Sequence, residues 1–169
     1  MGDFFFQGET KMNMMTVVLP EITIIGKQGM CTKEKDIVRE LWKQANGHFA
    51  EVAHLGMKEK NGSYVGFWGA MSDESMSFLP WTDNFSRGYY LAGIEVDKDT
   101  VVPDGWVKWT MPARTYLKVL VEPGQYLAIF QNVISGILPK MNLKISGAVC
   151  DYTEPATGTN YLLFPVNNQ

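Results

Sequence analysis

The hydrophobic pattern of the chain predicts the same succession of secondary-structure elements twice. In the first half, the Val- and Ile-rich residues 22–27 predict a strand, and apolar residues recur at helical spacing between 37 and 45. Two further strand-like stretches follow at 63–71 and 88–96. The turn-rich residues 97–105 then predict a junction between two similar halves.

The second half shows the same succession. Residues 106–110 and 114–121 predict β-structure, and the apolar positions between 126 and 137 share one face of a helix. Strand-like stretches at 143–152 and 160–166 close the chain. Each half is therefore predicted as a βαββ module. Two such modules indicate an α+β fold, an antiparallel sheet with two main helices and a cleft between the halves.

Particular residues mark the expected element boundaries. Thr32 is the predicted N-cap of the first helix, Gly47 is its predicted end, and Pro139 is expected to end the second helix. Residues 73–87 join two strands of the first half. Their length predicts either a packed surface loop or the rim of a pocket.

The pattern predicts one domain and a short arm. We expect residues 14–169 to form a single domain, with repeat 1 at about 16–96 and repeat 2 at about 106–167. Residues 1–13 predict an irregular N-terminal arm, whose Phe residues would dock on the domain or on a second copy. No apolar run approaches the roughly 20 residues that span a bilayer, so we expect a cytoplasmic protein without membrane contact.

Composition narrows the class of partner. The net charge of the 169 residues is −3, and the basic residues between 33 and 43 alternate with acidic ones. That alternation is typical of a solvated helix face, so no direct nucleic-acid binding is predicted. Cys31 and Cys150 lack zinc-ligand spacing and are expected to be free thiols in a reducing cytoplasm, although a disulfide remains an alternative.

Catalytic and metal-binding motifs are not found in the sequence. It contains no nucleophile elbow, P-loop or dinucleotide fingerprint, so neither a catalytic residue nor a cofactor is predicted. His48, Glu51 and His54 form an H-x₂-E-x₂-H arrangement that matches no metalloprotease pattern. A zinc site needs three or four convergent ligands, so no metal site is predicted.

The strongest candidates for a ligand site are aromatic and apolar residues on shared strand faces. Side chains two residues apart point the same way, and apolar walls with a few polar groups are typical of small-molecule sites. The predicted ligand-binding residues are Trp68, Tyr89, Leu91, Glu95, Trp106, Trp109, Tyr161 and Leu163. For each of them, ordinary packing in the core is the alternative interpretation.

Glu95 is the acidic residue of greatest interest in this set. If its strand face points inward, its carboxylate would lie in the pocket; if outward, it is a solvated edge residue. Glu122, Asp151 and Glu154 lie near predicted strand ends and are weaker candidates.

Several short segments together resemble a known family. They are residues 90–96 (YLAGIEV), 103–106 (PDGW), 111–113 (MPA), Tyr116 and 161–166 (YLLFPV). In this order they resemble the GyrI-like small-molecule-binding superfamily, which includes the effector-binding domains of AraC-type and MerR-type multidrug-responsive transcription activators. The resemblance covers about residues 22–166. It implies the duplicated βαββ fold with a ligand cleft between the halves.

The resemblance also has implications for the ligand. In many relatives an acidic residue near the start of the last strand pairs with cationic, lipophilic ligands, and Tyr161 stands at that position here. A tyrosine offers a ring face for cation–π contact but no full charge, so the charge preference of the site is left open. No helix-turn-helix segment is evident, so a stand-alone ligand-binding module is expected.

We therefore expect a protein that holds a small apolar or amphipathic molecule, cations included, in an aromatic cleft, as a sensor or sequestering protein linked to transcription regulation. This role is favoured over an enzymatic one. The alternatives are a hydrolase of reactive drug-like compounds, with Glu95 as the general base, and a gyrase-inhibitor-like module that contacts an unknown protein partner.

Overall fold

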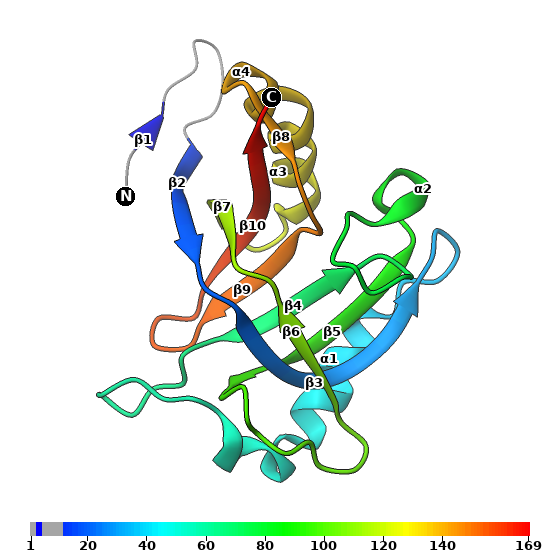
Figure 1. Cartoon of the computed structure of the whole chain (residues 1–169), viewed down its shortest axis with the longest axis vertical. Helices are drawn as coiled ribbons and strands as arrows, with labels where there is room; N and C mark the ends of the chain where they lie inside the picture. The colour runs from blue at the N-terminus through cyan, green and yellow to red at the C-terminus, as the bar shows by residue number, and fades with distance from the viewer. Residues whose placement is uncertain (1–2, 5–11) are drawn as a thin grey trace.

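The computed structural model describes residues 3–4 and 12–169 (Figure 1). The strands are β1 (Asp3–Phe4), β2 (Met12–Leu19), β3 (Ile22–Cys31), β4 (Phe67–Ser72), β5 (Gly88–Val96), β6 (Val107–Met111), β7 (Arg114–Val121), β8 (Leu143–Ile145), β9 (Cys150–Glu154) and β10 (Thr159–Asn168). The helical segments are α1 (Val38–Gly47), η1 (Phe49–Glu51), η2 (Ala53–Leu55), α2 (Thr82–Phe85), α3 (Tyr126–Asn132), η3 (Val133–Ile137) and α4 (Leu138–Lys140).

The α+β architecture is the predicted one. Both β3-α1-β4-β5 and β7-α3-β9-β10 are βαββ modules, and all strand pairs are antiparallel. The strand order β7-β10-β9-β4-β5-β3 places the modules side by side, with β9 of the second module paired to β4 of the first. The middle of the sheet is therefore the boundary between the two halves.

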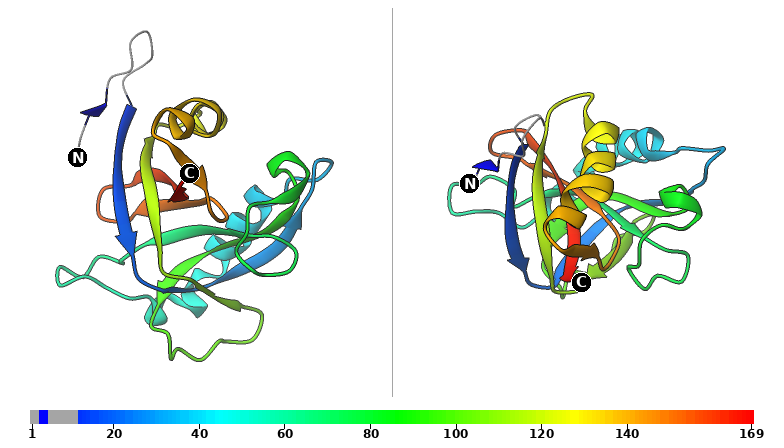
Figure 2. Two further views of the ribbon diagram at one scale, coloured as in Figure 1. Left: turned by 45° about the horizontal axis from the view of Figure 1, so that its top comes forward. Right: turned by 90° about the horizontal axis from the view of Figure 1, so that it is seen from above.

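A bent two-stranded ribbon joins the outer ends of this sheet. The segment β2–β3 pairs with the segment β6–β7, so that Leu19 faces Arg114 before the bend and Ile22 faces Met111 after it. The register does not shift across the bend, where Pro20 and Pro112 lie. Proline lacks the N–H of a regular ladder and is confined to edges and bends of sheets. The ribbon curls the sheet, as the crossing segments in Figure 2 show.

Strand β2 was not predicted from the sequence. The sequence predicts a first strand only at 22–27, whereas the residues on both sides of Pro20 are extended. Met12 and Asn13, expected in the irregular arm, belong to β2 and pair with Phe4 and Asp3 of β1. The rest of the expected arm, residues 1–2 and 5–11, lies outside the described part of the chain.

The helices differ from prediction at particular ends. Helix α1 ends at Gly47 as expected but begins at Val38 rather than after Thr32. Thr32 instead accepts the Lys35 N–H in a separate turn, and Asp36 accepts the Val38 N–H at 3.0 Å. The second helix continues past Pro139 to Lys140 and contains a π-helical segment just before that proline. Proline has no backbone N–H to donate, and the wider π-helical turn lies where the regular helical hydrogen bond of Pro139 is missing.

Two predicted strands are shorter than expected. The stretch 63–71 becomes regular only at Phe67, where β4 begins. The stretch 143–152 is split into β8 and β9, because the backbone turns to give a hydrogen bond from the Ala148 N–H to the Phe78 carbonyl, 2.9 Å long. The loop 73–87 is therefore fixed to the second half of the chain.

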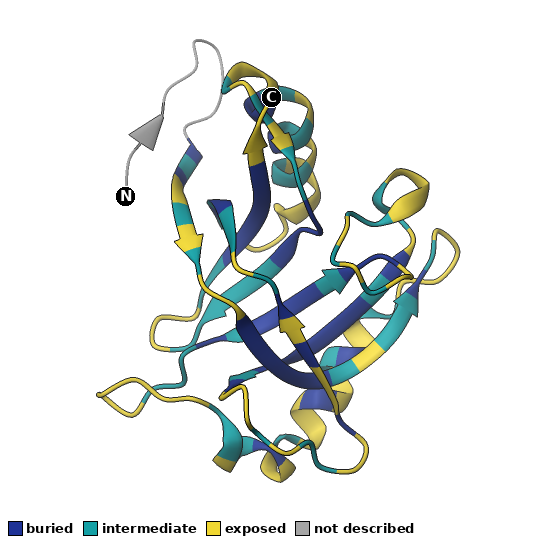
Figure 3. Ribbon diagram, in the orientation of Figure 1, coloured by how far each residue is buried: buried dark blue, intermediate teal, exposed yellow. Residues whose placement is uncertain are grey.

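Both faces of the sheet are apolar and buried. On one face, α1 covers Tyr90 and Ile94, and the second helix covers Leu162 and Phe164. On the other face, Leu91 and the other buried side chains pack inside the curl of the ribbon. Figure 3 shows the resulting buried run through the central strands. Successive side chains along these strands therefore point into two different cores, and neither face of the central strands is a solvent face.

Candidate functional site

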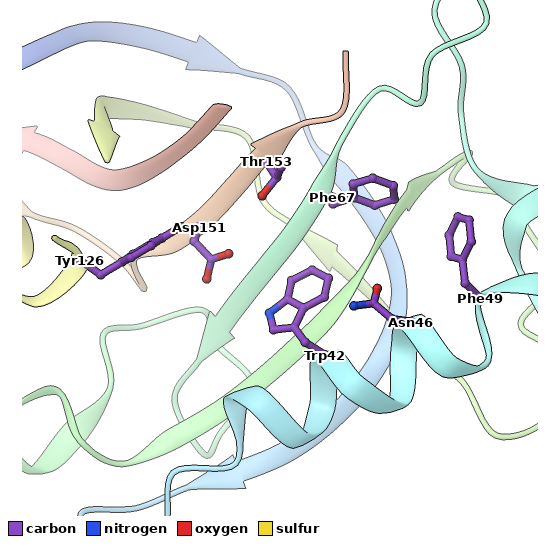
Figure 4. Close-up of a pocket in the computed structure, with 7 residues that line it drawn as sticks. All are labelled: Trp42, Asn46, Phe49, Phe67, Tyr126, Asp151 and Thr153. Carbon is purple, nitrogen blue, oxygen red and sulfur yellow. The ribbon is translucent and has the colours of Figure 1, made fainter. Parts of the chain in front are cut away.

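A cleft lies between the two main helices, on the face of the sheet that they cover. It comprises a larger chamber of about 1200 Å³ and a smaller one of about 360 Å³. Three side chains line both chambers: Trp42 from α1, Tyr126 from α3 and Asp151 from β9 (Figure 4). The cleft is thus built from both halves of the duplicated fold.

The two helices leave this space because they pack differently on the sheet. Helix α1 buries Leu41 and Ala45 against the sheet. The second helix is anchored through Val133 and Ile137, whereas its first segment, α3, has no buried residue. Leu127 at its start is 68% exposed. The start of α3 at Leu127 therefore stands exposed beside the cleft, whereas Ile129 and Phe130 are partly buried against the sheet, where Phe130 contacts Phe164.

Asp151 lies at the floor of the cleft. It pairs in the sheet with Gly69 of β4, and its Oδ2 accepts a 2.6 Å hydrogen bond from the Tyr90 hydroxyl of β5. The Tyr90 oxygen in turn accepts a 2.9 Å hydrogen bond from the Trp42 indole N–H. A Cβ on Gly69 would overlap both the Tyr90 oxygen and the Asp151 carboxylate. The missing side chain at position 69 is what lets the two polar groups meet across β4.

Burial dominates the electrostatics of this carboxyl group. It raises the pKa of Asp151 from 3.8 to about 6, against the lowering effect of hydrogen bonds from Tyr90 and the Gly69 N–H. The same burial and the nearby carboxylate raise the pKa values of Tyr90 and Tyr126 above their usual value of 10. The groups that set the Asp151 pKa within the described residues include no positive charge. Above pH 6 the Asp151 carboxylate is mostly ionised, and it forms no ion pair with a described residue.

The α2 turn lines the larger chamber at one end. Its Asp83, Asn84 and Phe85 have φ values of 52°, 55° and 61°, in the left-handed region that non-glycine residues rarely adopt. The turn places the Phe85 ring edge-to-face on Phe130 of α3, with 5.3 Å between ring centroids. The loop predicted as either packed or a pocket rim therefore supplies part of the rim.

None of the eight residues predicted from the sequence lines this cleft; their contact with a ligand stays a prediction. Six of them belong to the cluster on the opposite face of the sheet: Trp68, Tyr89, Leu91, Trp109, Tyr161 and Leu163. Glu95 accepts a 2.9 Å hydrogen bond from the Trp68 indole, and burial raises its pKa. Trp106 packs with the core beneath α1. The structure brings the six together but separates them from the helix-side cleft.

Tyr161 already has a cation beside it. The Lys118 ammonium lies 4.1 Å from the Tyr161 ring centroid and 5.2 Å from that of Tyr152. The ring face that the sequence suggested for a ligand cation is occupied by a side chain of the same protein. Tyr161 therefore already makes a cation–π contact within the protein, and its contact with a ligand stays a prediction.

The residues that line the cleft were missed for a simple reason. Tyr90 is adjacent in sequence to the predicted Tyr89 and Leu91, but it points to the other face of β5. The sequence favours Glu95 over Asp151 as the acidic ligand-binding residue, because Asp151 lies near the end of a predicted strand. Only the pairing of β9 with β4, and of β4 with β5, reveals that Asp151 faces Tyr90.

The described residues contain neither a cluster of metal ligands nor a membrane-spanning helix. No group of three or more His, Cys, Asp or Glu side chains could hold a metal ion there. His48 lies 3.6 Å from Glu51 on η1, and His54 forms no part of a metal cluster. Cys31 and Cys150 are free and buried. Within the same residues, no helix is both long and apolar enough to cross a bilayer.

Comparisons with known proteins identify the family. A family model, Cass2, described as integron-associated effector binding protein, matches residues 16–156. The chain belongs to this family. None of the curated proteins compared with the sequence matches it.

Solved structures share the fold at low sequence identity. The structure of SAV2435 bound to tetraphenylphosphonium has a TM-score of 0.67 and 12% identity, covering 92% of this chain and 94% of that one. The EcmrR C-terminal domain has a TM-score of 0.61 and 11% identity, with coverage of 94% and 99%. An integron cassette protein from the mobile metagenome of Vibrio cholerae has a TM-score of 0.53 and 13% identity, with coverage of 91% and 95%. The GyrI-like fold predicted from the sequence is thereby confirmed.

Proposed function

We propose that this protein binds a small organic cation in the cleft between α1 and α3, with Asp151 as the group that selects for positive charge. The observation that carries the proposal is the half-buried Asp151 carboxylate, which lines both chambers of the cleft and forms no ion pair with a described residue. An ionised carboxylate in such a place is costly unless a counter-charge compensates it. A bound cation would supply that counter-charge.

The walls of the cleft suit a lipophilic cation. Trp42 and Tyr126 stand at the carboxylate, and Phe130 and Ile134 extend the larger chamber. Aromatic faces attract cations through the ring quadrupole, and apolar walls contribute burial energy. The combination of one charged group with aromatic walls is what small-molecule sites require.

The comparisons support the proposal. The family is described as effector binding. A structural neighbour, SAV2435, has been solved with tetraphenylphosphonium, a lipophilic cation. Another neighbour, EcmrR, has been solved in a complex with DNA. The biological role that fits best is a sensor or sequestering protein for such molecules, linked to transcription regulation.

A matched pair of ligands tests the role of charge. An aryl trimethylammonium cation and its neutral tert-butyl isostere have nearly the same shape, so their difference in affinity reports the charge. Wild-type protein at pH 7.5 is expected to bind the cation at least tenfold more tightly, as measured by quenching of tryptophan fluorescence. In Asp151→Asn the preference should disappear. Equal binding of both ligands by the wild-type protein, or no binding of either, would overturn the proposal.

A further inference from the structure

The Asp151 carboxylate stands at the junction of two unequal chambers, not at the end of one. Asp151, Trp42 and Tyr126 are the side chains shared by the chambers of about 360 Å³ and about 1200 Å³. Figure 4 shows the carboxylate pointing into the space between Tyr126 on one side and Trp42 and Phe67 on the other. A ligand group bound to this carboxylate therefore has free volume on both sides.

Both chambers have apolar walls. The smaller one contains Phe49 and Phe67, whose rings meet edge-to-face with 6.0 Å between centroids. The larger one extends over Leu162 and Val149 towards Phe130. Ligand pockets span roughly 300–1,000 Å³, so the smaller chamber alone lies near the lower limit for an independent site. Each chamber therefore offers apolar surface to a ligand group, and the larger one is also lined by the charged side chains of Lys33, Asp36 and Arg39.

The carboxylate has hydrogen-bonding capacity left for a ligand. An ionised carboxylate offers about four acceptor positions. Within the described residues, the Tyr90 hydroxyl and the Gly69 N–H take one each. Charge-assisted hydrogen bonds are about twice as strong as neutral ones. A ligand whose positive group carries N–H hydrogens would use the remaining positions, whereas a fully alkylated or arylated cation would not.

From this geometry we infer that the preferred ligand is an elongated N–H cation, a secondary ammonium or an amidinium, flanked by two apolar groups of unequal size. The larger group would occupy the chamber beside α3, and the smaller group the chamber beside Phe49 and Phe67. This inference rests on the proposed function and adds the shape and donor chemistry of the ligand. Tetraphenylphosphonium, by contrast, is compact and has no N–H.

Three synthetic probes separate shape from donor chemistry. They are benzyl(naphthylmethyl)ammonium, its quaternary N,N-dimethyl analogue, and one-armed methyl(naphthylmethyl)ammonium. Calorimetric titration of the whole chain at pH 7.5 should show that the first probe binds at least tenfold more tightly than either of the others. Loss of the N–H donors weakens the second probe, and loss of an apolar arm weakens the third.

Two matched variants test the assignment of arms to chambers. Asn46 and Gln131 are both exposed helical residues that line the smaller and the larger chamber, respectively. Asn46→Trp should fill the smaller chamber and reduce binding of the two-armed probe to the level of the one-armed probe, without affecting the latter. Gln131→Trp should weaken both probes. Thermal melting checks that both variants fold.

The outcomes separate this inference from the proposed function. If all three cations bind with similar affinity and Asn46→Trp changes nothing, the two-armed ligand is ruled out while cation binding stands. If the quaternary probe binds as tightly as the N–H probe, the donor requirement is wrong. If none of the cations binds, the proposed function itself fails.

Discussion

The Tyr90 hydroxyl and the Asp151 carboxylate meet across an intervening strand, although the two residues are 61 positions apart. Tyr90 lies on β5 and Asp151 on β9, with β4 between them, and the 2.6 Å bond passes over Gly69. It joins the first half of the duplicated fold to the second. The same bond fixes the Asp151 carboxylate at the floor of the helix-side cleft.

Removing this bond should change both stability and charge. In Tyr90→Phe the carboxylate loses a donor that lowers its pKa, so the Asp151 pKa should rise further above 6. The free energy of unfolding at pH 7.5 should fall by roughly 1.5–3 kcal/mol, the usual range for a hydrogen bond to a charged group. Denaturant unfolding measures the first effect, and a carbon-13 titration of the Asp151 carboxyl measures the second.

Tyr89→Phe is the control for this experiment. Tyr89 is the neighbouring tyrosine on the other face of β5, and no described residue hydrogen-bonds to its hydroxyl. Its loss should change the unfolding free energy by less than about 0.5 kcal/mol. Equal destabilisation by the two substitutions would contradict the importance of the Tyr90–Asp151 bond.

Gly69 should be intolerant of any side chain. A Cβ at this position would overlap the Tyr90 oxygen and the Asp151 carboxylate, so Gly69→Ala should separate the pair and destabilise the protein by about 1–3 kcal/mol or more. Gly47→Ala is the matched control, because nothing lies within 4 Å of a Cβ there and alanine favours helices. That variant should be neutral or stabilising in thermal melting. A tolerated Gly69→Ala would show that the floor of the cleft is not held as described.

Stability should depend on pH through Asp151. Burial raises the folded-state pKa from 3.8 to about 6, so the native state favours the protonated acid. The protonated Asp151 carboxyl makes its full contribution to the free energy of unfolding below about pH 4. This contribution, up to about 3 kcal/mol in total, is lost as the pH rises through 6. Asparagine does not titrate, so the stability of Asp151→Asn should not depend on pH through position 151. The wild-type protein should therefore weaken relative to the variant between pH 4 and pH 8 in urea unfolding, and parallel curves would contradict the burial of this charge.

The two faces of the sheet can be told apart by ligand binding. Trp42→Phe alters the helix-side cleft and removes the indole N–H that Tyr90 accepts, so tetraphenylphosphonium affinity should fall several-fold. Tyr161→Phe keeps its ring on the opposite face beside Lys118 and should leave the affinity unchanged. Equilibrium dialysis compares the two without relying on tryptophan fluorescence. The reverse result would place the ligand among the residues predicted from the sequence.

The sequence predicts the fold well because each half carries its own periodic signal. Strand β5 has the predicted bounds, Gly88–Val96, and α1 ends at the predicted Gly47. Strand β2 was missed because Pro20 looks like the end of a strand. Its partner is β7 of the other half, a contact that no local pattern reveals.

The site was harder to predict because period-2 alternation shows which residues share a face, not which face the helices cover. Tyr90 and Leu91 are both almost completely buried, so exposure does not distinguish the two faces. Asp151 acquires its importance only from neighbours that the strand order supplies, namely Gly69 and Tyr90. Its acidic side chain alone resembles many others at strand ends.

The pH dependence of cation affinity tests the central claim most directly. If tetraphenylphosphonium binds only to ionised Asp151, with a pKa of about 6, wild-type affinity should fall about tenfold between pH 8 and pH 5. Asp151→Asn keeps the other charged side chains that line the larger chamber, Lys33, Asp36 and Arg39, so it removes only the charge under test. Isothermal titration calorimetry should therefore show a steep wild-type profile and a weak, flat one for the variant. Identical profiles for the two proteins would contradict the account.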